Sequence, residues 1–413
     1  MKVLWICNVM LPQIAKDLNK AVPFGGGWMA GLANDITTVE NIELYVCFPF
    51  GNFVEGEAEG LRYFGFASKE DLKTAIEKSG ADVVHIFGTE HKHSADVTDL
   101  CIELGIREKV VISIQGLVSV YSQHYINGIP KSVEKGYSLR DFIKRSNISK
   151  GKRAYEQKGA FEKQAIRNTN HIIGRTDWDY ACTRQINPEA TYHFCNETLR
   201  GAFYENEWGL DNCEKHSIFV SQCNYPIKGF HRILEAMPLI LKFYPDAKLY
   251  TTGRNVINEK GLKGSFKLTK YEQYLRKLIK KYKLEQNVEF LGALDENKMC
   301  QRYLKSHVFV SPSSIENSPN SVGEAMILGV PTVTSDVGGI KVLFNHNVDG
   351  FIYQADAPYM LADCVIKIFE SDELAKMFSK NAKKHASATH NRENNLKTMI
   401  KIYEEIGKME EKY

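Results

Sequence analysis

The sequence predicts an α/β protein made of two domains, each built around its own parallel sheet. Short apolar, β-branched runs alternate with longer amphipathic stretches in the first half of the chain, which is the rhythm of strand, helix, strand. The same rhythm begins again at residues 217–222. At 413 residues the chain is too long for one ordinary hydrophobic core and suits two domains.

The strand-like runs and the segment between them give the expected boundaries. The runs are KVLWICNV, IELYVCF, DVVHIF and VVISIQG in the first half, and SIFVSQ, AKLYTTG, NVEFLG, HVFVSP and TVTSD in the second. Residues 196–216 are polar and without clear periodicity, which is typical of a linker. We therefore expect a first domain over residues 1–205, a second over 206–394, and a terminal helix, 395–413, that packs back on the first.

Composition indicates an ordinary globular protein of the cytoplasm. Apolar residues make up 43% of the chain and charged residues 25%. No run approaches the roughly 20 apolar residues that cross a bilayer, and the chain begins directly in a strand-like run rather than in a leader peptide. Nine scattered Cys without a C-x-x-C pair argue against disulfides and zinc, so we expect reduced, mostly buried thiols.

Positive charge is unevenly distributed, although the net charge of +3 does not argue for a nucleic-acid partner. Residues 131–167 contain eleven Lys/Arg and four Asp/Glu, and residues 260–283 contain nine Lys/Arg and one Asp/Glu. Interleaved aromatic residues would let such a face rest on an anionic membrane, at the inner side of the cell membrane, or on an anionic acceptor. The alternative is a solvated helix surface.

Residues 307–336 form the most informative segment, which we interpret as strand, loop, helix, turn and strand. Ser318 is the expected N-cap and Pro319 the first helical residue. A helix that begins just beyond the carboxyl end of a parallel strand offers unpaired amides and the positive end of its dipole to an anion. A diphosphate is therefore expected on the amides of Asn320, Ser321 and Val322.

Two acidic residues flank this helix start. Glu324 lies four residues after Asn320, hence on the same helical face, and its Cα–Cβ bond tilts back toward the N-terminus. Its carboxylate can accept hydrogen bonds from ribose hydroxyls. Glu316 precedes the helix, where it can reach the sugar ring or the leaving phosphate. As bare spacing the pair is a weak signal, because acidic pairs recur by chance.

In context the segment is specific, with N-S-P-N between the acids and E-A-M-x-x-G-x-P-x-V after them. It resembles the family-4 glycosyltransferases, whose E-x7-E region carries this pattern. The resemblance implies the GT-B fold, with two Rossmann-like β/α/β domains that face each other across a cleft. It also implies a retaining transfer of a sugar from a nucleotide-sugar donor, with no cofactor and no metal. The base would lie near backbone groups around Leu291 to Leu294.

A lysine and two arginines are candidates for the positive charge of the site. Lys228, in YPIKGFHRILEAM, precedes a helical stretch, and its K-G matches the donor-lobe motif in which the lysine neutralises charge on the departing diphosphate. Relatives carry an Arg about five positions earlier, where this chain has Cys223. Arg175 and Arg254 each follow a strand-like run and are expected to replace it; the alternative for both is a surface salt bridge.

The first domain offers acceptor-side candidates. Gly25, Gly26 and Gly27 lead through Trp28 into a helical stretch, and the family has a glycine loop here that faces the donor phosphates and the acceptor. Gln115 stands where many relatives carry a His beside the reacting sugar, and its amide can orient a hydroxyl but cannot exchange a proton. The other candidates are His85, for which a core role is the alternative, His124 and Tyr125. His91 and His93 look like metal ligands, but we expect no metal.

The sequence therefore favours a glycosyltransferase that acts on a hydroxyl of a glycan or lipid-linked acceptor, in cell-envelope or polysaccharide biosynthesis. Two other hypotheses stay open. A GT-B sugar phosphorylase would use free phosphate and a sugar phosphate instead of a nucleotide-sugar. A non-catalytic protein that binds nucleotide-sugars would keep the fold without turnover.

Overall fold

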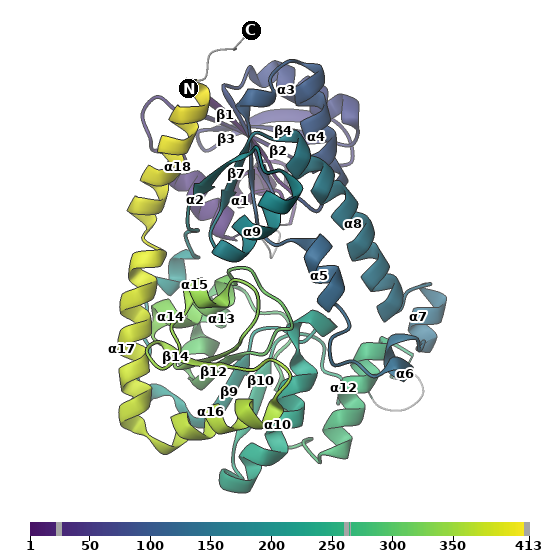
Figure 1. The fold of residues 1–413 in the computed structure, drawn as a ribbon, viewed down its shortest axis with the longest axis vertical. Coiled ribbons are helices and arrows are strands. Elements are labelled where there is room, and N and C mark those ends of the chain that lie inside the picture. The colour runs from purple at the N-terminus through teal and green to yellow at the C-terminus, as the bar shows by residue number, and fades with distance from the viewer. Residues whose placement is uncertain (22–26, 260–263, 265, 409–413) are drawn as a thin grey trace. The chain divides into compact units, whose positions relative to one another are not determined.

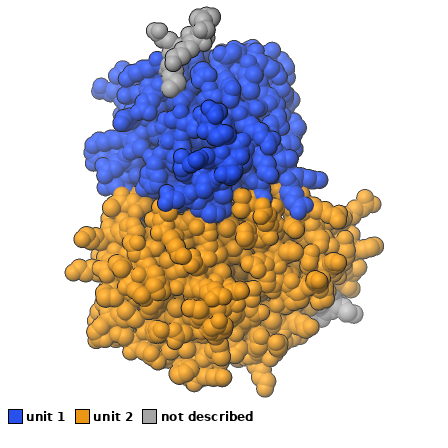
Figure 2. All heavy atoms as spheres, viewed as in Figure 1, with its two compact units in different colours: residues 1–119, 156–201, 390–413 blue, residues 120–155, 202–389 orange. Residues whose placement is uncertain are grey.

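The computed structural model describes residues 1–21, 27–259, 264 and 266–408, and the chain divides into two compact units (Figures 1 and 2). Unit 1 comprises residues 1–119, 156–201 and 390–413, and unit 2 comprises residues 120–155 and 202–389. The expected division at residue 205 lies close to the observed one. Residues 120–155 depart from expectation, because they belong to unit 2.

The reason for this departure is packing against residues distant in the sequence, which no local pattern predicts. The Tyr125 ring packs on Tyr155 at 4.9 Å between centroids. The Asp141 carboxylate accepts a hydrogen bond of 2.7 Å from the backbone amide of Lys270, far along the chain. The Asp141–Lys270 bond joins residues 120–155 to the second sheet domain, while the Tyr125–Tyr155 contact holds the two ends of the segment together.

Unit 1 is built on an eight-stranded sheet in the order β3-β4-β2-β1-β5-β6-β7-β8, parallel except for β3. The central strand β1 is buried from Val3 to Ile6. Trp5 lies opposite Val46 on one side and His85 on the other. The strands are β1 Lys2–Ile6, β2 Glu43–Pro49, β3 Val54–Ala58, β4 Leu61–Phe66, β5 Val83–Phe87, β6 Val110–Ser113, β7 His171–Gly174 and β8 Thr191–Phe194.

Helices cover this sheet, and the last helix of the chain completes its core. Apolar side chains of that helix, among them Met399, Ile402 and Ile406, lie in the same buried cluster as Val3 and Val83. The helices are α1 Pro12–Asp17, α2 Gly27–Thr37, α3 Lys69–Ser79, α4 Lys92–Glu103, α9 Asp177–Ile186 and α18 Arg392–Gly407, with the 3-10 turn η1 Arg107–Lys109. Helices α5 Val118–His124 and α8 Ile148–Asn168 each run from one unit into the other.

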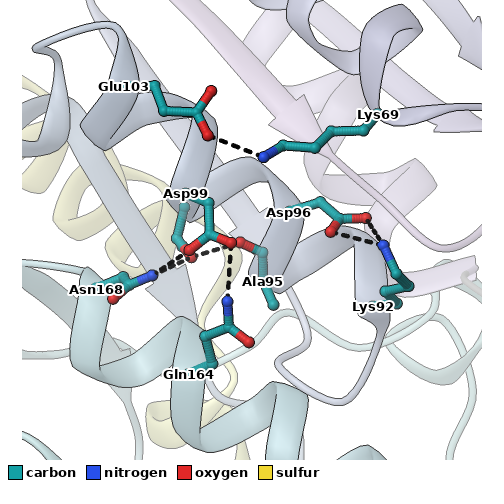
Figure 3. A network of polar contacts seen from close by, with 9 residues as sticks. Lys69, Lys92, Ala95, Asp96, Asp99, Glu103, Gln164 and Asn168 are labelled. Carbon is teal, nitrogen blue, oxygen red and sulfur yellow. Dashed lines mark hydrogen bonds and ion pairs between the residues drawn. The ribbon is translucent and has the colours of Figure 1, made fainter.

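A polar network anchors α4 to its neighbours in unit 1 (Figure 3). The Asp99 carboxylate accepts hydrogen bonds from the side-chain amides of Gln164 and Asn168 on α8, at 2.8 and 2.7 Å. Glu103 pairs with Lys69 of α3 at 3.0 Å. Exposed pairs of this kind each contribute roughly 0–1 kcal/mol, so they orient α4 more than they stabilise it.

His85 belongs to a buried hydrogen-bond chain in unit 1, and its expected acceptor-side role is wrong. Tyr403 Oη accepts from Trp5 Nε1 at 3.0 Å and lies 2.6 Å from His85 Nδ1. Because the indole only donates, the hydroxyl proton points to Nδ1, and Nε2–H then donates to Ser113 Oγ at 2.7 Å. Burial lowers the pKa of His85 to about 3, so the ring is neutral.

Unit 2 is built on a six-stranded parallel sheet in the order β11-β10-β9-β12-β13-β14. The strands are β9 Glu214–Val220, β10 Lys248–Thr251, β11 Val288–Phe290, β12 Ser306–Ser311, β13 Thr332–Ser335 and β14 Gly350–Tyr353. The helices are α6 Lys131–Glu134, α7 Leu139–Ile143, α10 Phe230–Phe243, α12 Lys270–Lys281, α13 Glu296–Leu304, α14 Asn320–Leu328, α15 Ile340–Leu343, α16 Pro358–Glu370 and α17 Asp372–Thr389. The described residues from 201 to 228 also form the 3-10 turns η2 Gly201–Phe203, which begins at the last residue of the middle segment of unit 1, η3 Leu210–Asn212 and η4 Pro226–Lys228.

The segment expected to be a linker is partly built into unit 2. Trp208 is buried at 5% exposure, and its indole N–H donates to the Ser306 carbonyl at 2.8 Å. The Trp208 amide donates to the Leu328 carbonyl at 2.8 Å. A polar, aperiodic stretch can therefore be ordered when single side chains enter a neighbouring core.

Tyr403→Phe tests the buried chain around His85. The substitution removes an acceptor from Trp5 and a donor from His85, and unsatisfied buried groups cost about 1–3 kcal/mol each. We expect a lower melting temperature by circular dichroism. The control is Tyr359→Phe, at a tyrosine that is 64% exposed, and it should melt like the unmodified chain. Equal melting of both variants would contradict the proposed hydrogen bonds.

Buried histidines predict acid sensitivity of folding. Burial lowers the pKa of five of them to about 3 or 4: His85, His93, His171, His231 and His307. In the unfolded chain each takes up a proton near pH 6.5, so the unfolded state binds more protons and stability falls as pH drops below about 6.5. Thermal melts at pH 7.5, 6.0 and 5.0 should show midpoints that fall stepwise, and a constant midpoint would contradict this.

Candidate functional site

The candidate site of unit 2 lies where the strand order of its sheet reverses. From β9 the chain continues to β10 and β11 on one side and then crosses to β12 on the other, and ligands of open α/β sheets bind at the carboxyl ends of such strands. A pocket of about 200 Å³ lies at that point. Its lining comes from the ends of β9 and β12 and from the start of α14: Val220, Ser221, Gln222, Lys228, Val310, Ser311, Pro312, Ser313, Glu316, Pro319, Asn320 and Ser321.

A buried ion pair forms the floor of this pocket. Lys228 Nζ lies 2.7 Å from Glu316 Oε1, and Ser313 Oγ donates to the same oxygen at 2.7 Å. The side chains are 23% and 8% exposed, respectively. Burial by itself would lower the pKa of Lys228, but the charge of Glu316 overcomes this and raises it, so the ammonium stays charged. The structure thus brings together two residues that the sequence offered as separate candidates.

Three tethers hold the loop that carries Glu316. The Ser314 amide donates to the Ile227 carbonyl at 2.7 Å, beside Lys228. Ser335 Oγ, at the end of β13, donates to the Ser313 carbonyl at 2.6 Å. The Gly339 amide donates to the Glu316 carbonyl at 3.1 Å. The backbone of the loop is thus fixed on three sides, while Lys228 and Ser313 hold the carboxylate itself.

The helix start differs from expectation by one residue. Helix α14 begins at Asn320 with Pro319 as N-cap and without a side-chain cap, so Ser318 is not the cap. The Val322 amide donates to the Pro319 carbonyl at 2.9 Å, and its expected part in anion binding is therefore wrong. The amides of Asn320 and Ser321 are the two that precede any intrahelical bond, and both residues line the pocket.

The other donor-side candidates of unit 2 lie outside the pocket lining. Glu324 lies one turn further along α14 and is 5% exposed. Leu291 and Leu294 follow β11 and are half-buried, and the Leu291 amide donates to the Thr251 carbonyl at 2.9 Å. Contacts of Glu324 with a ribose and of Leu291 and Leu294 with a base stay predictions.

Neither candidate arginine fills the place of the missing Arg in unit 2. Arg254 Nη1 donates to the Lys267 carbonyl at 2.5 Å and its Nε lies 3.8 Å from Glu272, so the surface salt-bridge alternative holds for it. The expected place contains Cys223, which is buried, and burial raises the pKa of its thiol to about 12. A neutral thiol supplies no charge, which leaves Lys228 as the cation of the pocket lining.

Arg175 belongs to a second polar cluster, in unit 1. It is 5% exposed, its guanidinium forms an ion pair with Glu197, and its Nη2 donates to the Ile114 carbonyl at 3.2 Å. Gln115 Nε2 donates to Glu197 Oε1 at 2.6 Å. Arg175, Glu197 and Trp28 line a cavity of about 20 Å³ at the carboxyl ends of β5 to β8, which has room for about one water.

The remaining first-domain candidates fall in different places. Gly25 and Gly26 lie outside the described residues, while Gly27 begins α2. The Trp28 ring packs edge-on against Phe87 at 5.7 Å. His124 and Tyr125 belong to unit 2 rather than to the first domain, and Tyr125 is buried.

The rings of the two histidines after β5 form a stacked pair. The rings of His91 and His93 lie 4.9 Å apart, and His91 Nε2 lies 3.0 Å from Glu90. Within residues 1–21, 27–259, 264 and 266–408, no three His, Cys, Asp or Glu side chains are placed to hold a metal ion. All nine cysteines are free, and seven of them are buried.

Sequence reasoning missed two residues that organise these sites. Ser313 orients Glu316, and Glu197 joins Arg175 to Gln115. The signal for Ser313 is its spacing of three residues from Glu316, which suits a loop hydrogen bond. Glu197 lay inside a stretch interpreted as a linker, so its only signal was a carboxylate shortly after a strand.

Part of the chain is similar in sequence to known glycosyltransferases. Residues 202–385 match the family described as Glycosyl transferases group 1. YtcC of Bacillus subtilis, whose glycosyltransferase name is itself provisional, is 26% identical over 205 residues, 49% of this chain and 48% of YtcC. The chain spans about half the length of the curated relatives it matches.

Solved structures establish the fold over nearly the whole chain. Sucrose-phosphate synthase of Thermosynechococcus elongatus superposes with a TM-score of 0.69 at 15% identity, covering 98% of this chain and 99% of that one. HepE of Anabaena, solved with UDP and glucose, gives 0.68 at 14% identity, covering 98% and 100%. The expected GT-B fold with two Rossmann-like domains is confirmed.

Gly229→Ala tests the geometry of the pocket floor. Gly229 has φ +66°, and a Cβ there would lie 1.8 Å from the Pro312 carbonyl oxygen, so η4 and the Glu316 loop would have to separate. Two costs lower the free energy of unfolding of this variant. An alanine in the left-handed conformation costs about 1–2 kcal/mol. The clash with the Pro312 carbonyl should add about 1–3 kcal/mol. Gly60→Ala, at φ +83° in open space, measures the cost of the left-handed conformation alone. Equal shifts in thermal melts of the two variants would contradict the close approach.

Proposed function

We propose that this chain is a retaining, metal-independent glycosyltransferase of family 4 type, which moves a sugar from a nucleoside-diphosphate sugar to a hydroxyl acceptor. The observation that carries the proposal is the Lys228–Glu316 pair beside the open start of α14, at the switch point of a parallel sheet. It lies inside the region that matches Glycosyl transferases group 1. A cation, a helix start and a carboxylate are together suited to a sugar diphosphate.

The donor diphosphate would bind at the start of α14. Asn320 and Ser321 line the pocket, and their amides and the positive end of the helix dipole would favour a negative ligand there. Glu324, on the next turn of α14, would accept hydrogen bonds from the ribose hydroxyls. The base would lie near Leu291 and Leu294, at the carboxyl edge of the same sheet.

Lys228 would neutralise the charge that builds up on the leaving diphosphate. Its ammonium is already paired with Glu316, so it is held in place before the donor arrives, and no reorientation is needed during the reaction. In a partly dry pocket such an interaction is stronger than in water. Glu316 keeps lone pairs that can accept a hydrogen bond from a sugar hydroxyl while it fixes the lysine.

The proposed transfer retains the anomeric configuration. The bond between the anomeric carbon and the phosphate oxygen breaks, and the acceptor oxygen forms its bond on the same face. Because the acceptor attacks that face directly, no protein nucleophile is required. The acceptor proton passes to the leaving diphosphate oxygen. Asn320, Ser321 and Lys228 would each stabilise the diphosphate more as its charge grows, which is the condition for catalysis rather than mere binding.

Unit 1 would supply the acceptor side through its own polar cluster. Gln115 is held by Glu197, which is in turn paired with Arg175. An amide fixed in this way can orient a hydroxyl without exchanging its proton. Trp28 lies beside this cluster, where its ring would contact a sugar or a polyol at the surface. We propose a glycan or lipid-linked acceptor, met at the inner face of the cell membrane in envelope or polysaccharide biosynthesis.

Two substitutions separate binding from turnover. Lys228→Ala should lower the rate of donor hydrolysis or transfer by about 10²-fold or more, because it removes stabilisation of the leaving group. Glu324→Ala should weaken nucleotide binding, measured by calorimetry, with a smaller effect on the rate at saturation. The control is Lys298→Ala, at a lysine that is 72% exposed on α13. Near-normal activity of both site variants would contradict the assignment.

A thermal melt with added ligands distinguishes the alternative functions. Protection by nucleoside diphosphates, and not by inorganic phosphate or a sugar phosphate, supports a transferase over a phosphorylase. Hydrolysis of a nucleotide-sugar without acceptor, screened over a panel of donors, would rule out a protein that only binds. Protection by inorganic phosphate alone would favour the phosphorylase.

A further inference from the structure

Helix α7 and the residues beside it expose their large apolar side chains, while the polar Ser138 and Asp141 are buried. Phe142 is 71% exposed and Ile143 68%, the two highest values among the large apolar side chains of the described residues. Tyr137 and Leu139, a few residues earlier, are 48% and 44% exposed. In an ordinary surface helix the apolar face is the buried one.

The buried polar side chains of α7 explain why its apolar side chains point to solvent. Ser138 and Asp141 are 3% and 2% exposed and form a capping box at the start of α7. The Asp141 carboxylate also accepts a 2.7 Å hydrogen bond from the Lys270 amide, at the N-terminus of α12. The buried carboxylate thus fixes α7 to unit 2, and the orientation is specified by hydrogen bonds rather than by burial of apolar area.

The exposed charges around α7 have one sign. Residues 131–153 contain eight Lys/Arg and two Asp/Glu, and of the two acids Asp141 is buried and Glu134 partly buried. The basic side chains nearest the apolar ones, Lys135, Lys144 and Arg145, are exposed. An apolar cluster ringed by basic side chains matches the boundary of an anionic lipid layer, where acyl chains and phosphates lie side by side.

A pocket behind α7 extends this basic surface toward the candidate site of unit 2. Its volume is about 370 Å³, and Arg145, Lys150 and Lys270 line it. Tyr225 and Pro226 line it from the other side, directly before Lys228. A phosphate held at this surface would therefore lie near the turn that carries the candidate catalytic lysine.

We propose that the α7 surface, formed by Tyr137, Leu139, Phe142 and Ile143 with Lys135, Lys144 and Arg145, docks on an anionic lipid bilayer. Phe142 and Ile143 enter the interface, and the basic side chains contact headgroup phosphates. Attachment is peripheral, and among the described residues no helix is long and apolar enough to cross a membrane. The inference stands apart from the transferase proposal, because it concerns where the chain binds and not what it transfers.

Co-sedimentation of the full chain with lipid vesicles tests the proposal. We expect binding to vesicles that contain phosphatidylglycerol, weak binding to pure phosphatidylcholine, and release by high salt. Lys144→Gln with Arg145→Gln should weaken binding about 30-fold, at about 1 kcal/mol for each charge. Phe142→Ser with Ile143→Ser should weaken it by about tenfold or more.

The chain provides a matched control for both changes. Lys242 and Phe243 are an adjacent basic and apolar pair at the end of α10, both exposed, with Phe243 at 64%. Lys242→Gln with Phe243→Ser should leave vesicle binding unchanged. All variants change exposed side chains, so their melting temperatures should match that of the unmodified chain.

Three outcomes would overturn the proposal. They are absence of binding to anionic vesicles, equal loss in the Lys242/Phe243 control, and self-association of the chain through Phe142 and Ile143 without vesicle binding. The last would show that a second copy covers the surface. None of these results bears on donor hydrolysis, which is measured without lipid, so the transferase proposal is tested separately.

Discussion

A partly buried ammonium and a buried carboxylate, 88 positions apart in the chain, hold the candidate site of unit 2 together. Removing water from two charges is costly unless they meet each other and further hydrogen bonds, and here Ser313 supplies one. The close packing of Gly229 on Pro312 brings the two segments within reach. The pair is therefore as much a product of backbone packing as of charge, and the pocket shape and its electrostatics depend on the same few contacts.

Both units collect polar groups at the carboxyl ends of their parallel strands, and in unit 2 the reason is topological. Where neighbouring strands connect in opposite directions, no crossover helix covers the space between them, and side chains from both loops meet there. In unit 2 the result is the Lys228–Glu316 pair beside the start of α14. In unit 1 the strand order reverses between β1 and β5, whereas the Arg175–Glu197–Gln115 cluster lies further along the sheet, after β6, β7 and β8. One cluster is suited to an anion, while the other is suited to neutral hydroxyls.

Apolar side chains are used in two opposite ways at α18 and α7. Helix α18 buries Met399, Ile402 and Ile406 in the core of unit 1 and adds Tyr403 to a buried hydrogen-bond chain. Helix α7 places Phe142 and Ile143 in solvent and is anchored by Asp141. Because an exposed apolar surface is unfavourable in water, a helix anchored by its polar side chains suits a partner that supplies the missing apolar environment.

The sequence by itself determined the alternation of strands and helices, the two sheets, and the helix near Asn320, because these depend on local periodicity and on turn residues. The E-x7-E segment and Lys228 were also recognisable, since both are short motifs. Only the tertiary structure decided that His85 is a core residue, that Arg175 pairs with Glu197, that the Val322 amide is occupied, and that residues 120–155 join unit 2. Each of these depends on a partner or on a degree of burial that no local pattern encodes, because it arises only when distant segments pack.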